Sequence, residues 1–173
     1  MMAVREFDAD ALYDAMDAER KARGMSWRQL ADAIWEQSAA LNARRRDHPI
    51  SPSTLTGIAK RHDTTCQHAL GILQWLGRSP ESFVPGAVVD APLPVAGPDR
   101  RLRWSLLALY EAVDARRRER GLTWIQLARE LRCGPSQLTG LKTARYAISM
   151  RLAMRIVQWL EQPASTFVYL AEW

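Results

Sequence analysis

Residues 123–142 read TWIQLARELRCGPSQLTGLK, and this stretch predicts two short helices joined by a tight turn. Thr123 and Gln126 have the spacing of a capping box, in which a hydroxyl and an amide satisfy free N–H groups at a helix start. Apolar residues follow at the period of one buried helix face: Ile125, Leu127, Ala128 and Leu131. A first helix is therefore expected to begin near Trp124.

This first helix is predicted to stop at Cys133-Gly134-Pro135. Gly134 permits a turn, and the fixed φ of Pro135 suits the first turn of a new helix. Leu138 and Leu141 then supply an apolar face for the second helix.

The spacing of the inward-facing residues resembles that of a known motif. Ala128 and Leu138 stand ten positions apart, with Leu131, Cys133 and Leu141 at the other inward positions. This pattern is similar to the helix-turn-helix of Cro/C1-type (XRE-like) DNA-binding domains. In that family the small residue lets two helices cross closely, and the exposed side of the second helix faces the DNA major groove. The resemblance implies these contact residues: Ser136, Gln137, Thr139 and Gly140 toward the groove, and Lys142 and Arg145 toward phosphates.

Two positions depart from the family pattern. The Gly that members usually carry at the start of the turn is Arg132, and Gly134 follows two residues later. Where many members have a phosphate-contacting Gln at the start of the first motif helix, this chain has Trp124. The first departure concerns the geometry of the turn, and the second concerns one phosphate contact.

The two halves of the chain align with each other, which indicates one fold used twice. Residues 23–31 (RGMSWRQLA) correspond to residues 120–128 (RGLTWIQLA) at an offset of 97. Residues 53–58 (STLTGI) correspond to residues 136–141 (SQLTGL) at an offset of 83, and the later helices align at an offset of 84. The alignment adds these DNA-contact candidates in the first half: Ser53, Thr54, Thr56, Lys60 and Arg61.

We predict an all-α fold of two repeated four-to-five-helix bundles of helix-turn-helix type. The first domain would span residues 1–84 and the second residues 99–173, on either side of a Pro/Gly linker at residues 85–98. Such a linker favours an extended, semi-stiff form. Two arrangements are open: the domains reach successive major grooves, or they pack through a pseudo-twofold axis while the linker wraps them.

The first half contains fourteen extra residues between Ala31 and Ser53. Residues 34–46 show no helix breaker and predict that the second helix extends by several turns, before a longer connection at residues 48–52. A tight helix-turn-helix is thus expected only in the second half. The basic runs at residues 44–46 and 116–118 fit either phosphate contacts or helix ends that complement the helix dipole.

The formal net charge of +5 is unevenly distributed along the chain. Residues 1–86 hold 11 Lys and Arg against 11 Asp and Glu, whereas residues 87–173 hold 13 against 8. The surplus in the second half favours binding of a polyanion, and it would also serve solubility.

Several classes of function are not expected. Cys66, Cys133 and the three histidines have no metal-ligand spacing, so we expect neither a metal nor a disulfide. The chain shows no membrane segment and no leader, which favours the cytoplasm. It lacks a Gly-rich phosphate loop and a nucleophile motif, so neither enzymatic activity nor a cofactor is expected.

The leading hypothesis is a transcriptional regulator that inserts the third helix, mainly that of the second repeat, into the major groove of double-stranded DNA. Of the groove-facing candidates, only Gln137 is a residue type that reads bases in a bidentate manner, which favours weak, shape-assisted or backbone-dominated binding. The alternative is an antitoxin-like or other protein-binding helical module, with a protein partner or as a homodimer. The apolar C-terminus at residues 167–173 motivates this alternative, and its burial would weaken it.

Overall fold

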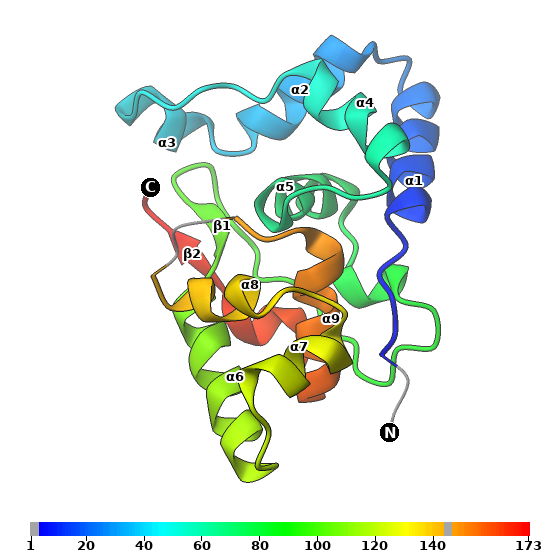
Figure 1. Cartoon of the computed structure of the whole chain (residues 1–173). Coiled ribbons are helices and arrows are strands. Elements are labelled where there is room, and N and C mark those ends of the chain that lie inside the picture. The colour runs from blue at the N-terminus through cyan, green and yellow to red at the C-terminus, as the bar shows by residue number, and fades with distance from the viewer. Residues whose placement is uncertain (1–3, 144–146) are drawn as a thin grey trace.

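The computed structural model describes residues 4–143 and 147–173, and these residues are mostly helical (Figure 1). The first half contains α1 (Ala9–Ala22), α2 (Trp27–Glu36), α3 (Ala39–Arg44), α4 (Pro52–Arg61), α5 (Cys66–Leu76) and the 3-10 helix η1 (Pro80–Phe83). The second half contains β1 (Arg101–Trp104), α6 (Leu106–Glu119), α7 (Trp124–Leu131), α8 (Pro135–Thr139), η2 (Gly140–Thr143), α9 (Met150–Leu160), η3 (Ala164–Phe167) and β2 (Val168–Ala171). The prediction of a mainly helical fold is confirmed.

A small sheet was not expected from the sequence. β1 and β2 pair antiparallel, with Arg101 opposite Ala171 and Trp104 opposite Val168. The two strands lie at opposite ends of the second half, so nothing local in either sequence indicates their pairing. The sheet holds the C-terminal segment against the residues that follow the linker.

Side-chain caps fix the starts of the helices. Ser26 accepts the N–H of Gln29 at 3.1 Å, and the Gln29 side chain accepts the N–H of Ser26 at 2.8 Å. Thr123 and Gln126 make the same two bonds at the same distances. The predicted capping box of Thr123 and Gln126 is therefore confirmed, the aligned residues Ser26 and Gln29 form a second one, and Ser149 caps α9.

The second helix of the first half is shorter than predicted. It ends at Glu36, and a separate helix, α3, begins at Ala39. The side chains at the break bond to backbone oxygens that lie far away in sequence: Gln37 donates to Gly71, and Ser38 donates to Arg100. Those partners become available only in the folded molecule, so the local sequence gave no sign of a break. The prediction of one continuous helix is wrong for this reason.

Matching contacts recur 97 residues apart. The rings of Tyr13 and Trp27 stack with centroids 5.6 Å apart, and those of Tyr110 and Trp124 do so at the same distance. An arginine covers each Trp ring and donates to a nearby backbone oxygen, namely Arg20 to Met25 at 2.7 Å and Arg117 to Leu122 at 2.8 Å. The offset of 97 that aligns the sequences also relates these contacts.

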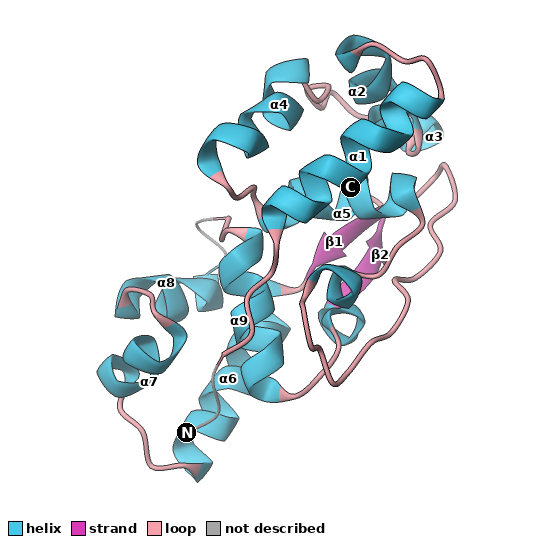
Figure 2. Ribbon diagram, turned by 90° about the vertical axis from the view of Figure 1, so that its right-hand side faces the viewer, coloured by secondary structure: helices cyan, strands magenta, loops and turns pink. Residues whose placement is uncertain are grey.

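Buried residues of both halves form one continuous core, in which α5 packs against α9. The linker lies on this core. Leu93 and Ala96 pack against it, and the Pro98 oxygen accepts the N–H of Leu41 at 3.1 Å. Figure 2 shows the linker as a long loop along the edge that carries the sheet. The two halves are thus in direct contact, and the linker wraps around them.

The residues before α1 also join the halves. Glu6 lies close to three arginines of the second half: it is 2.9 Å from Arg155, 3.5 Å from Arg132 and 3.6 Å from Arg151. Three positive charges around one half-buried carboxylate fix the position of the N-terminal segment on α9.

Candidate nucleic-acid interface

The turn between α7 and α8 is formed without the glycine conformation that the sequence suggested. Arg132 ends α7 in the left-handed region, with φ at 55°, whereas Gly134 has a φ of −78° that any residue can adopt. Arg155 supports the turn, because its Nη1 donates to the oxygens of Leu131 and Arg132 at 3.2 Å each. The prediction that Gly134 permits the turn is therefore wrong, and Arg132 makes the turn at the position where the XRE-like pattern has glycine.

The second helix of the motif is short and continues as a 3-10 turn. Pro135 stands in its first turn, as predicted, and Leu138 and Leu141 are buried. These two leucines hold α8 and η2 against α7 and α6. The opposite side of the segment is left facing solvent.

Most of the groove-facing candidates of the second half are exposed. Ser136, Gln137, Thr139 and Lys142 are exposed, and Gly140 is partly exposed. Arg145 lies outside the described residues. Position 124, where family members often contact a phosphate, holds a Trp whose ring is stacked on Tyr110.

The side chain of Gln137 already makes a hydrogen bond within the protein. Its Oε1 accepts the N–H of Gly134 at 2.9 Å and so caps the start of α8. A bidentate contact with adenine requires both the oxygen and the nitrogen of the amide. Gln137 would have to break its cap to read a base in that way, which supports backbone contacts over base readout.

The corresponding helix of the first half, α4, is longer and more regular. Ser51 caps it by accepting the N–H of Thr54 at 3.3 Å. Ser53, Lys60 and Arg61 are exposed, and Thr54 and Thr56 are partly exposed. The guanidinium of Arg61 folds back over Gly57, since a Cβ at that glycine would stand 2.7 Å from Arg61 Nη1. The exposed face of α4 is thus polar, with its basic residues at the C-terminal end.

The segments that precede α5 and α9 bond to each other in a reciprocal manner. The N–H of Cys66 donates to the oxygen of Ile148 at 2.9 Å, and the N–H of Met150 donates to the oxygen of Thr64 at 2.7 Å. Thr65 and Ser149, which lie between these donors and acceptors, form an antiparallel bridge and cap α5 and α9. The paired positions are 84 residues apart, as in the sequence alignment. The junction has no local signal in the sequence, although Thr65 and Ser149, both of residue types that cap helices, stand at that offset.

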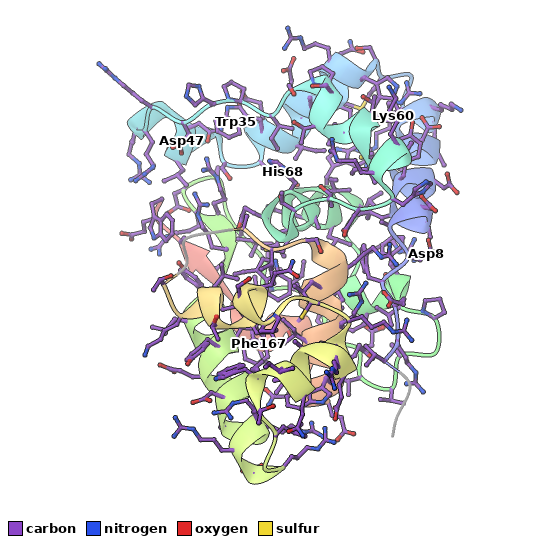
Figure 3. All side chains as sticks on the ribbon, in the orientation of Figure 1. Asp8, Trp35, Asp47, Lys60, His68 and Phe167 are labelled. Carbon is purple, nitrogen blue, oxygen red and sulfur yellow. The ribbon has the colours of Figure 1, made fainter. Side chains whose placement is uncertain are left out.

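α4 and α8 lie on the same side of the molecule, on either side of this junction (Figures 1 and 2). A cleft of about 530 Å³ lies between α4 and residues 147–149. Ser53, Thr54, Arg61 and His68 line one wall, and Ala147, Ile148 and Ser149 line the other. Lys60 and His68, labelled in Figure 3, belong to the two helices of the first half that border this cleft. Burial, together with the nearby charge of Arg61, lowers the pKa of His68, so this side chain is neutral at pH 7.

The charge of the two third-helix segments, residues 52–61 and 135–143, is modest and positive. Residues 131–160 include five Lys and Arg and no Asp or Glu. Three of those five surround Glu6, as described above. Among the described residues, the basic side chains of the two third-helix segments are therefore Lys60, Arg61 and Lys142.

The basic run at the end of α6 does not contribute to this side. Arg117 and Arg118 both pair with Asp114, at 2.7 Å and 2.9 Å, and Arg120 pairs with Glu130 at 2.9 Å. Arg116 lies over the ring of Trp159. These charges are engaged within the second half, at the far end of α6 from the β1–β2 sheet (Figure 1).

Other kinds of site find no support in residues 4–143 and 147–173. No three His, Cys, Asp or Glu side chains there are grouped so that they could hold a metal ion. None of the helices described is long and apolar enough to cross a membrane. Burial raises the pKa of the Cys66 thiol to about 11 and also raises the pKa of Cys133, so neither thiol is activated as a nucleophile.

Comparisons of the chain with family models, with curated proteins and with solved structures give no match.

Proposed function

We propose that this chain is a cytoplasmic DNA-binding protein and a transcriptional regulator, built from two XRE-like helix-turn-helix repeats. The observation that carries the proposal is the exposed polar side of α8 and η2. It holds no acidic residue and lies on the same side of the molecule as the corresponding face of α4. In this proposal α8 enters the major groove and Lys142 contacts a phosphate.

The tandem repeat is part of the proposal. It is supported by the Tyr–Trp–Arg contacts that recur 97 residues apart and by the reciprocal bonds between positions 84 residues apart. Two copies of one unit that meet through corresponding residues behave like the subunits of a symmetric dimer.

The side chains available favour contacts with the sugar-phosphate backbone. Ser136 carries a short hydroxyl that can donate to a phosphate oxygen, whereas the Thr139 hydroxyl donates to the Pro135 oxygen at 3.3 Å and Gln137 is engaged in its cap. Binding of this kind tolerates many sequences and weakens steeply as salt increases.

Fluorescence anisotropy with a labelled duplex, measured at about 50 mM and about 200 mM salt, tests the proposal. We expect binding at the lower salt and a clear loss of affinity at the higher salt. Lys142→Ala should weaken binding to all sequences and reduce the salt slope by about one. The matched control is Arg118→Ala, which removes an equally exposed cation that pairs with Asp114. An absence of binding at low salt, or equal losses from the two variants, would contradict the proposal.

A second candidate function, a protein-binding module or homodimer, is favoured by one observation. In β2 Val168 and Ala171 are buried, but Tyr169 and Leu170 of this strand keep 38% and 37% of their surface exposed, and Trp173, two residues beyond it, keeps 49%. Sedimentation velocity over a range of concentrations tests this candidate. A dimer that Trp173→Ser dissociates would support it, and a monomer at all concentrations would leave DNA binding as the better function.

A further inference from the structure

We propose that one chain binds one DNA duplex at two half-sites, with α4 in one major groove and α8 in the next, and that the two half-sites are unequal. This inference rests on the proposed function and goes further, because it assigns the same duplex to both repeats and sets the stoichiometry.

The contact between the two halves is reciprocal. The bonds from Cys66 to Ile148 and from Met150 to Thr64 exchange donor and acceptor between corresponding positions. A twofold rotation about an axis that passes between Thr65 and Ser149 produces this reciprocity. The chain thereby contains the isologous contact that a dimeric DNA-binding protein would form between two copies.

The third helices, α4 and α8, flank that axis. α4 and α8 lie on the same side of the molecule, one on each side of the junction (Figure 2). Twofold-related recognition helices fit half-sites that are centred about one helical turn apart. The duplex between the half-sites would then face the cleft beside Thr65 and Ser149. The acidic residue of that cleft is Asp63, and its Oδ1 already accepts the N–H groups of Thr64 and Arg151.

Hydrogen bonds beyond the junction also join the two halves. Trp104 Nε1 donates to the oxygen of Cys66 at 2.9 Å, and Glu81 accepts the N–H of Ala164 at 2.8 Å. Together with the shared core, these bonds fix one half against the other. The spacing between half-sites is therefore set by the fold and not by the reach of a flexible linker.

The two helices differ in ways that make the half-sites unequal. The groove-facing positions of the two helices match except for Thr54, which corresponds to Gln137. The basic residues are placed differently, because Lys60 and Arg61 correspond to Thr143 and position 144, whereas Lys142 corresponds to Ala59. α4 has ten residues and α8 has five. Similar bases with differently placed phosphate contacts are expected at the two half-sites.

Native mass spectrometry and anisotropy with a duplex of about 25 base pairs test the inference. We expect one chain per duplex. Lys60→Ala combined with Arg61→Ala should reduce affinity about tenfold and lower the salt slope by about two. Lys142→Ala should lower the salt slope by about one. The two effects should add, because the sites are independent contacts with one ligand. Circular dichroism melting verifies that each variant is folded, and Arg118→Ala is the control for net charge.

The outcomes separate the two proposals. The two-site inference would be overturned by two chains per duplex. It would also be overturned if Lys142→Ala weakened duplex binding while the variant with Lys60→Ala and Arg61→Ala bound as tightly as the unmodified protein. Either result would leave DNA binding through α8 intact. An absence of duplex binding by the unmodified protein would overturn both.

Discussion

Glu161 and Gly77 occupy corresponding positions at the ends of α9 and α5, and both have positive φ, at 56° and 66°. A residue with a Cβ pays a steric cost in this left-handed conformation, which glycine avoids. Glu161→Gly should therefore raise the free energy of unfolding by about 1 kcal/mol. Urea denaturation at neutral pH measures the change. Gly77→Ala is the matched control and should lower the same quantity, so two changes of the same sign would contradict this explanation.

Glu81 makes stability depend on pH. It is buried, its Oε1 accepts the N–H of Ala164, and its Oε2 has no protein partner within the described part of the chain. Burial, with a smaller contribution from Asp90, raises the pKa of Glu81 above its ordinary 4.5. The folded state then holds the proton more tightly than the unfolded state. The resulting stabilisation is complete below pH 4.5 and is lost as the pH rises through the raised pKa.

Glu81→Gln should remove this pH dependence. Relative to the unmodified protein, the variant should gain free energy of unfolding as the pH rises from 4.5 toward 7, whatever the offset at low pH. Urea titrations of both proteins across this range provide the test. A constant difference between them would show that Glu81 keeps its ordinary pKa in the folded state.

At the scale of elements, α4 contains a glycine that the helix itself does not need. Gly57 has helical neighbours on both sides, and the guanidinium of Arg61 covers it. Gly57→Ala should raise the free energy of unfolding by about 0.5–1 kcal/mol, because alanine favours the helix and the exposed end of Arg61 can move away. The variant should also bind DNA more weakly, since a methyl group then stands on the proposed groove face.

Thermal denaturation and duplex anisotropy of the same preparation measure both effects of Gly57→Ala. The control is Ala59→Gly, an exposed position in the same helix, which should lower stability by a similar amount. If Gly57→Ala left the affinity for the duplex unchanged, the exposed side of α4 would not be a DNA-contact surface.

The elements that could be predicted from sequence are those whose signals are local. Thr123 marked a helix start because its bonding partner, the N–H of Gln126, lies three residues away. The aligned Ser26 accepts the N–H of Gln29 at the same separation. The break between α2 and α3 could not be predicted, because the partners of Gln37 and Ser38 are supplied by other segments. The β1–β2 sheet could not be predicted for the same reason, because its strands are short and distant in sequence.

In the candidate site, too, features with local signals could be predicted from the sequence, and features that depend on distant contacts could not. The exposure of Ser136, Gln137 and Thr139 follows from the periodicity that buries Leu138 and Leu141, so it was predictable. The engagement of Gln137 with Gly134 was not, and neither was the left-handed conformation of Arg132, which the contacts of Arg155 help to hold. The hydrogen bonds from Arg155 thus stabilise a left-handed conformation that arginine adopts less readily than glycine.

For the molecule as a whole, the continuous core predicts that both halves unfold together. Leu12 of α1 and Leu109 of α6 are fully buried at corresponding positions. Leu12→Ala should lower the free energy of unfolding by about 2–5 kcal/mol. Hydrogen exchange should then accelerate in α9 as much as in α5.

Leu109→Ala is the reciprocal control, and it should reduce protection in α5 of the first half. If protection of backbone amides against hydrogen exchange were lost only in the half that carries the substitution, the two halves would unfold independently. The fixed spacing between α4 and α8 would then lose its structural basis.

The most direct test of the central claim maps the surface of the isotope-labelled protein that contacts duplex DNA, by amide chemical shifts in an NMR titration. The account predicts that the perturbed amides belong to α4, α8, η2 and residues 147–149, on one side of the molecule. Shift changes confined to the C-terminal strand or to the end of α6, or no changes at low salt, would contradict it.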